Sequence, residues 1–121
     1  MNGQLGQITV NDTVFKSMAA RATLSVEGIT EFGSTFSEKV VNLVTRKGNS
    51  GINIEVGTEE IAVDMKLVLE YGRNIPETAA KVQKAVRDEL QEWTGYRVVE
   101  VNVLFVDLNI KTESRELARA R

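Results

Sequence analysis

Two stretches near the middle of the chain alternate apolar and polar residues with a period of two. Residues 52–56 place isoleucine, isoleucine and valine on one face, and residues 61–71 continue the same alternation after a turn at 57–60. This period gives a strand one buried face and one wetter face. The two stretches therefore predict an antiparallel hairpin.

Apolar residues repeat at helical spacing before and after this hairpin. Each predicted helix begins near a residue favoured at helix N-termini and stops at a glycine. The first starts at Asn11 and Asp12 and stops at Gly28, while the second has Pro76 in its first turn and runs through residue 94 to Gly95. Trp93 ends the apolar stripe of the second helix, and the pattern places it in the core.

Shorter signals complete the order of elements. Residues 8–10 and 29–32 predict short strands, residues 37–46 a short capped helix, and residues 98–108 a long final strand rich in β-branched side chains. The order is β-α-β-(short α)-β-β-α-β. It predicts an α+β fold: one two-layer domain with a mostly antiparallel sheet and two amphipathic helices on one face.

The length of 121 residues allows one hydrophobic core of ordinary size. We expect residues 1–110 to form a single domain and residues 111–121, which are rich in charge, to be a flexible C-terminal tail. The first residues carry no secretory pattern, and no apolar run approaches the length of a membrane span. A cytoplasmic protein is therefore expected.

Composition removes much of the usual enzyme chemistry. The chain has neither cysteine nor histidine, so it lacks thiol nucleophiles, disulfides and the commonest general base and metal ligand. The only acid–base candidates, Glu55, Asp64 and Glu70, alternate with Lys66 on the wetter face of the hairpin, where charged residues usually solubilise a surface. The sequence predicts no enzyme activity, no catalytic residues, no cofactor and no metal site.

Charge also bears on the type of partner. The formal net charge is −2, which disfavours binding to nucleic acid. Residues 48–51 spell the GxxG of RNA-binding KH modules, but they lead directly into a strand, whereas that loop must join two helices. A connecting turn is the favoured interpretation.

The final strand departs from simple amphipathic patterning because it is apolar on both faces. If it pairs beside residues 61–71, Val68, Leu104, Val106 and Leu108 are expected to form one apolar patch opposite the helices. We expect this patch to be an interface for a second copy of the chain or for another protein. The alternative is that the segment at 37–46 folds over it.

Several short motifs follow one another in a set order along residues 6–108. They are Gly6-Gln-Ile8, Val26-Glu-Gly28-Ile29, Gly51-Ile-Asn-Ile-Glu-Val-Gly57, Glu60-Ile-Ala-Val-Asp-Met65, Glu70-Tyr-Gly72, Ile75-Pro-Glu77, Lys81-Val-Gln83, Thr94-Gly-Tyr96 and Val98-Val-Glu-Val-Asn-Val103. As a set, they resemble the alkaline shock protein family, the envelope-stress-response and general-stress proteins of Gram-positive and related bacteria. Residues 33–47 match this family poorly.

This resemblance implies a non-enzymatic, stress-associated scaffold that works through self-association and protein partners. It implies a cytoplasmic location, in some members at the inner membrane surface through a membrane-anchored partner. The family has no defined catalytic residues to carry over. The alternative function is a small regulatory binding module for RNA or a small ligand, in line with family members linked to the control of fatty-acid synthesis.

Overall fold

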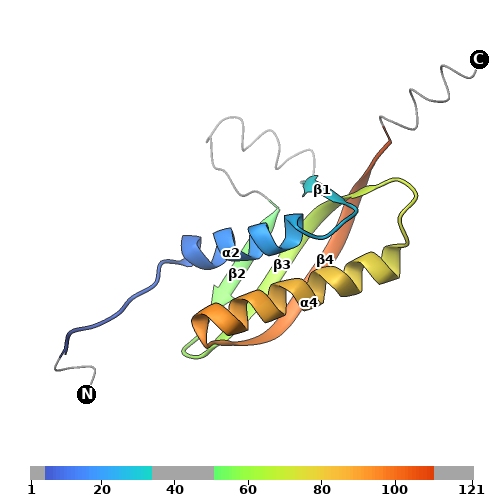
Figure 1. Cartoon of the computed structure of the whole chain (residues 1–121). Helices are drawn as coiled ribbons and strands as arrows, with labels where there is room; N and C mark the ends of the chain where they lie inside the picture. Colours follow the sequence, from blue (N-terminus) through green and yellow to red (C-terminus); the bar gives the residue numbers. More distant parts are fainter. Residues whose placement is uncertain (1–4, 34–50, 111–121) are drawn as a thin grey trace, which may run out of the picture.

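A computed structural model describes residues 5–33 and 51–110, which form a four-stranded sheet with two helices on one of its faces (Figure 1). The elements in chain order are α2 (Asp12–Leu24), β1 (Ile29–Phe32), β2 (Ile52–Val56), β3 (Glu60–Glu70), α4 (Ile75–Thr94) and β4 (Arg97–Asn109). The predicted α+β domain is confirmed, including both helices and the central hairpin.

Strand β3 organises the sheet because every other strand pairs with it. β1 and β2 pair antiparallel with successive parts of one flank of β3. β4 pairs parallel along the opposite flank, and α4 makes the crossover that a parallel connection requires. Two of the three pairings are antiparallel, as the prediction of a mostly antiparallel sheet requires.

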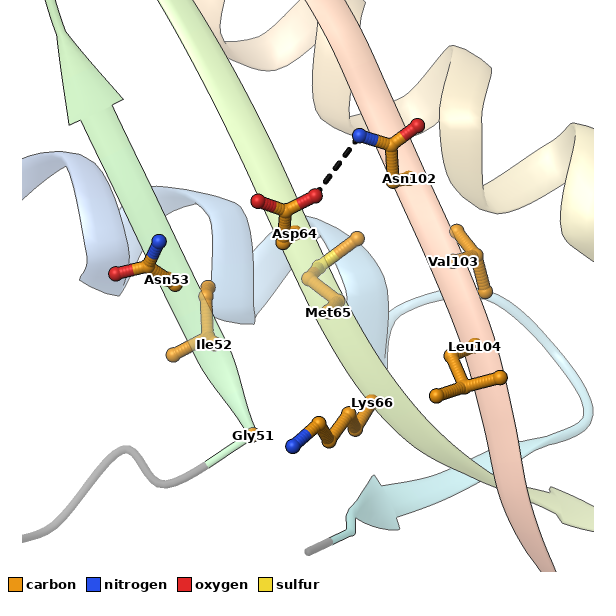
Figure 2. A pocket seen from close by; sticks show the side chains of 9 residues that line it. All are labelled: Gly51, Ile52, Asn53, Asp64, Met65, Lys66, Asn102, Val103 and Leu104. Atoms are coloured by element: carbon orange, nitrogen blue, oxygen red, sulfur yellow. Dashed lines mark hydrogen bonds between the residues drawn. The ribbon is translucent and has the colours of Figure 1, made fainter.

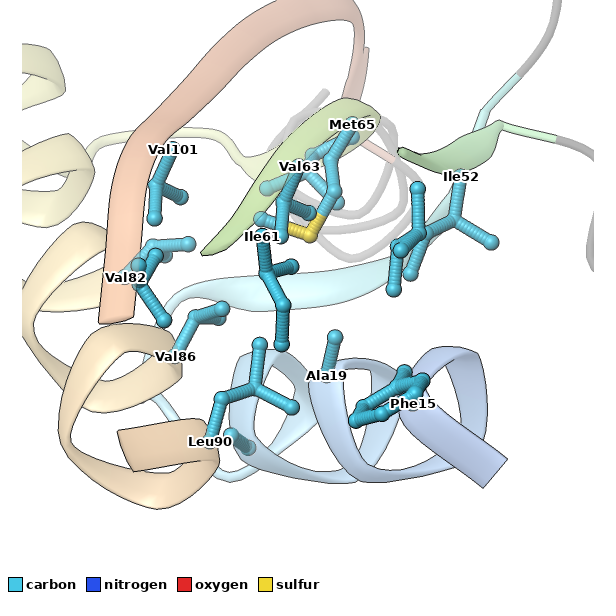
Figure 3. Packing of buried hydrophobic residues seen from close by; sticks show 14 of the residues in the cluster. Phe15, Ala19, Ile52, Ile61, Val63, Met65, Val82, Val86, Leu90 and Val101 are labelled. Atoms are coloured by element: carbon cyan, nitrogen blue, oxygen red, sulfur yellow. The ribbon is translucent and has the colours of Figure 1, made fainter. Parts of the chain in front are cut away.

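The core lies between β3 and the two helices (Figure 3). Ile61, Val63 and Met65 project from one face of β3, as their period-two spacing predicts. Facing them, Phe15 and Ala19 come from α2, and Val82, Val86 and Leu90 come from α4, all at helical spacing and almost completely buried. The ring of Phe15 also packs on Tyr96, with centroids 5.3 Å apart.

The helix ends follow the capping signals of the sequence. Asn11 Oδ1 accepts a hydrogen bond from Thr13 N–H, and Asn74 Oδ1 accepts one from Glu77 N–H, each at 2.9 Å. Gly95 ends α4 in the left-handed conformation, with φ of 77°, where glycine has no steric penalty.

One predicted element is wrong, and others lie outside the described residues. Residues 8–10 form no strand, and Ile8 is 94% exposed, because no neighbouring strand pairs with this run within the described part of the chain. The short helix predicted at 37–46 and the tail predicted at 111–121 fall in segments that the structure does not describe.

The two ends of residues 34–50 meet at a single position on β3. Gly33 N–H donates to the carbonyl of Lys66 at 2.8 Å, and Lys66 N–H donates to the carbonyl of Gly51 at 2.6 Å. A side chain at Gly51 would overlap the Gly33 carbonyl, and its φ of 90° also favours glycine. The chain therefore leaves the sheet and returns to it at the same place.

Candidate interaction surface on the final strand

The face of the sheet turned away from the helices carries a hollow of about 360 Å³ (Figure 2). It extends across β2, β3 and β4, and its lining residues are Gly51, Ile52, Asn53, Asp64, Met65, Lys66, Asn102, Val103 and Leu104. The Asn102 side-chain amide donates to the Asp64 carboxylate at 2.8 Å and also lies 3.2 Å from the carboxylate of Glu100. The hollow is thus part polar and part apolar, with Leu104 at its apolar end.

The three carboxylates considered in the sequence lie apart on the structure. Glu55 and Asp64 are exposed on different strands, and Asp64 is held by an amide rather than by a second acid. Glu70 instead accepts a hydrogen bond from Arg73 at 2.7 Å, an interaction that raises the pKa of Arg73. Within residues 5–33 and 51–110, no three acidic residues come together as a possible metal site.

The four residues predicted to form an apolar patch have very different exposures. Val68 is buried, with 6% of its surface exposed, whereas Leu104 is 57% and Leu108 is 46% exposed. Val106 is half-buried. The structure therefore offers some of the predicted apolar surface to a partner, but not Val68.

Two irregularities in the pairing of β3 with β4 change which residues share a face. The register shifts between Ile61 and Ala62 and again between Leu67 and Val68, so that β4 has an extra residue at each place. Leu104 pairs with Lys66 on the outer face, but Leu108 pairs with Leu69, whose side chain belongs to the core on the helix side. The assignment of Leu104 and Leu108 to one face is therefore wrong.

Val106 packs against residues from two other strands. A side-chain carbon at Gly33 would overlap Val106 Cγ2 and would lie 3.3 Å from Val68 Cγ2. The absence of a side chain at Gly33 thus leaves room for these two valines, which cover each other on the outer face.

The shifted end of β4 opens onto a second apolar hollow, of about 530 Å³, on the helix side of the sheet. Leu69, Phe105 and Leu108 line it from the strands, while Tyr71 and Ile75 line it from the connection to α4. Tyr71 is 54% exposed, although the alternation of the hairpin suggests a core position, because it lies just beyond the end of β3.

The exposed tryptophan is a feature that sequence reasoning missed. The stripe of α4 predicts a core position for Trp93, but this residue is 70% exposed and borders a hollow with Arg21 and Glu89 between the two helices. The stripe is buried only as far as Leu90, because α2 contributes the small Ala22 and the polar Ser25 to that hollow. The one available signal in the sequence is the position of the tryptophan in the last turn of the helix.

These features define a small α+β domain whose most distinctive surface is a long, apolar edge strand. A model of the alkaline shock protein family, described by a cell envelope-related function, matches residues 1–110. The chain belongs to this family, and the resemblance seen in the sequence motifs is confirmed.

Similar proteins in other bacteria agree with this assignment. The stress response regulator gls24 homolog of Streptococcus pyogenes is 32% identical over 112 residues, covering 89% of this chain and 62% of that protein. The chain thus spans about three-fifths of the length of that relative. YqhY of Bacillus subtilis is 26% identical, covering 93% of this chain and 84% of YqhY, and YloU of the same species is 30% identical, covering 81% and 84%.

Among solved structures, a MamM CTD variant has the same overall fold. It aligns with a TM-score of 0.51 at 12% sequence identity, covering 81% of this chain and 98% of the other. At this identity the likeness concerns the fold alone. In the part of the chain described here, neither helix combines the length and apolarity needed to cross a membrane.

Proposed function

We propose that this chain is a non-enzymatic, stress-associated interaction protein that acts by binding further copies of itself and other proteins. The observation that carries the proposal is the exposure of large apolar side chains along β4, with Leu104 57% and Leu108 46% exposed at one edge of the sheet. An exposed strand edge with apolar side chains is a template for association.

Family membership supports a stress or envelope role. The matched family is described by a cell envelope-related function, and the similar streptococcal protein is named a stress response regulator. Neither description names an enzyme. We place the site of action in the cytoplasm, with attachment to the inner membrane surface through a membrane-anchored protein partner.

Self-association is tested by sedimentation velocity of the whole chain over a wide concentration range. The proposal predicts an average mass that rises with concentration, because each buried leucine side chain contributes about 1–2 kcal/mol before the cost of association is subtracted. A monomer at every concentration would remove self-association from the proposed function and leave only foreign partners.

The non-enzymatic part is tested separately with Asp64→Asn. Asp64 is the acidic residue that lines the outer hollow, so it is the group best placed to act on a bound small molecule. We expect no turnover from the parent protein in a broad hydrolase and transferase screen. A reproducible turnover that Asp64→Asn abolishes would refute the proposal.

A further inference from the structure

Strand β4 lies at an edge of the sheet, and only part of that edge is capped. In the described part of the chain its one strand neighbour is β3, so every second residue of β4 directs its backbone groups away from the sheet (Figure 1). Two glutamines of α4 cover the first half of this edge: Gln91 Oε1 accepts from Val98 N–H, and the Gln83 amide donates to the Val101 carbonyl, each at 3.0 Å.

The alternation that turns Val98 and Val101 outward continues along the strand. Val103 and Phe105 follow Val101 by two and four residues, before the second register shift, so their backbone groups also point away from β3. Among the described residues, no glutamine or other side chain is seen to bond to these backbone groups. The open part of the edge is therefore residues 103–105.

The side chains around this open stretch suit pairing of the stretch with itself. Residues 103–106 are Val, Leu, Phe and Val, so no charge opposes a second copy there. Leu104 projects from the face turned away from the helices, where it is 57% exposed (Figure 2). Natural edge strands usually discourage such pairing with a charge or a proline, and neither occurs within this run.

We propose that residues 103–105 pair antiparallel with the same residues of a second copy, about a two-fold axis at Leu104. Val103 of each copy then faces Phe105 of the other, which allows four backbone hydrogen bonds, and the two Leu104 side chains meet on the outer face. The inference rests on the self-association in the proposed function and identifies its surface. The sheets of two copies would join into one continuous sheet.

A cysteine cross-link tests the position of the axis. The chain has no cysteine, so Leu104→Cys introduces a single thiol. Facing residues of this kind in an antiparallel pair have Cα atoms about 4.5 Å apart, a separation that a disulfide can span. We expect mild oxidation to convert Leu104→Cys to a covalent dimer at least about tenfold faster than the control Val99→Cys, which is also exposed on β4 but lies outside the open stretch.

Charge exchange tests the same pairing without oxidation. Leu104→Glu and Leu104→Lys each bring like charges together across the axis, and each is expected to weaken self-association by about tenfold or more. An equimolar mixture of the two variants is expected to recover it, since opposite charges then face each other. Val99→Glu serves as the control, and circular dichroism of every variant reports whether the fold is intact.

The outcomes separate the surface from the proposed function. If the parent protein self-associates while Leu104→Glu does so equally well and Leu104→Cys cross-links no faster than Val99→Cys, the edge pairing is refuted and self-association through another surface stands. If the parent protein is monomeric throughout and Leu104→Cys does not cross-link, the edge pairing and self-association both fail. Binding of a foreign protein by a monomeric chain, lost in Leu104→Glu, also refutes pairing with a second copy.

Discussion

At the scale of single residues, Gly33 shows how tightly the outer face is packed beside β4. Its missing side chain makes room for Val106, which in turn covers Val68. A valine on the outer face of an isolated strand would be expected to be exposed, but here two valines are sheltered by a close approach of β1. Val106 is therefore a packing residue, whereas Leu104, two positions earlier, remains available to a partner.

Gly33→Ala is expected to destabilise the domain by about 1–3 kcal/mol, because the added methyl group overlaps Val106 and the neighbouring strands have little freedom to move. Urea unfolding, followed by circular dichroism, measures the change. Gly57→Ala is the matched control: the nearest atom to its added carbon is the Glu60 carbonyl at 3.5 Å, an ordinary contact. Its stability is expected to change by less than about 1 kcal/mol.

The double variant Gly33→Ala with Val106→Ala tests the cause of this loss. Removing the two methyl groups of Val106 relieves the overlap, so the pair is expected to be more stable than the sum of the single changes implies. Strict additivity would show that Gly33 matters for a reason other than contact with Val106.

At the scale of elements, α4 does more than cover the core, because its glutamines also satisfy backbone groups of β4. Gln91 lies at the end of the helix next to the turn into the strand, where its side-chain oxygen accepts from Val98 N–H. This contact joins the last turn of α4 to the start of β4. Its loss would leave a partly buried donor without its protein partner.

Gln91→Met is expected to lower the free energy of unfolding by about 1 kcal/mol, since the side chain keeps its length but loses the acceptor. Gln91→Glu keeps an oxygen at the same position and is expected to stay close to the parent protein. Thermal unfolding of the three proteins provides the comparison. Equal losses in both variants would mean that the hydrogen bond itself contributes nothing.

Elements with a clear hydrophobic period were predictable, and those defined by their neighbours were not. The hairpin and both helices follow directly from spacing, and Asn11 and Asn74 act as N-caps. The face of each residue in β4 could not be read from alternation, because two extra residues interrupt it and their positions depend on the register with β3. The same dependence explains residues 8–10, which have strand composition but no partner strand in the described part of the chain.

At the scale of the whole molecule, β3 connects every strand and the core forms a single cluster. Damage to one strand therefore cannot be confined to a separate subdomain. The sequence placed β3 and β4 side by side, and the structure adds that they run parallel. The apolar surface of β4 could be anticipated from composition, but the restriction of its open edge to residues 103–105 required the glutamine contacts of α4.

Truncation after Ile110 is expected to change the melting temperature by no more than about two degrees, because charged chain ends contribute little to a core. The truncated and whole chains should both unfold in one cooperative transition. Differential scanning calorimetry measures both properties. A loss of about 10 °C would show that residues 111–121 dock on the domain.

The meeting of Gly33 and Gly51 at Lys66 also makes this domain a convenient host for protein engineering. Because the sheet fixes both ends of the intervening segment close together, the entropy of closing a connection there rises only slowly with its length, by about 0.6 kcal/mol for each doubling. A reporter domain whose own termini are adjacent could be inserted at this point with little strain on the sheet. The opposite end of β4 would stay free, so a fluorescent insertion of this kind could follow assembly in living cells.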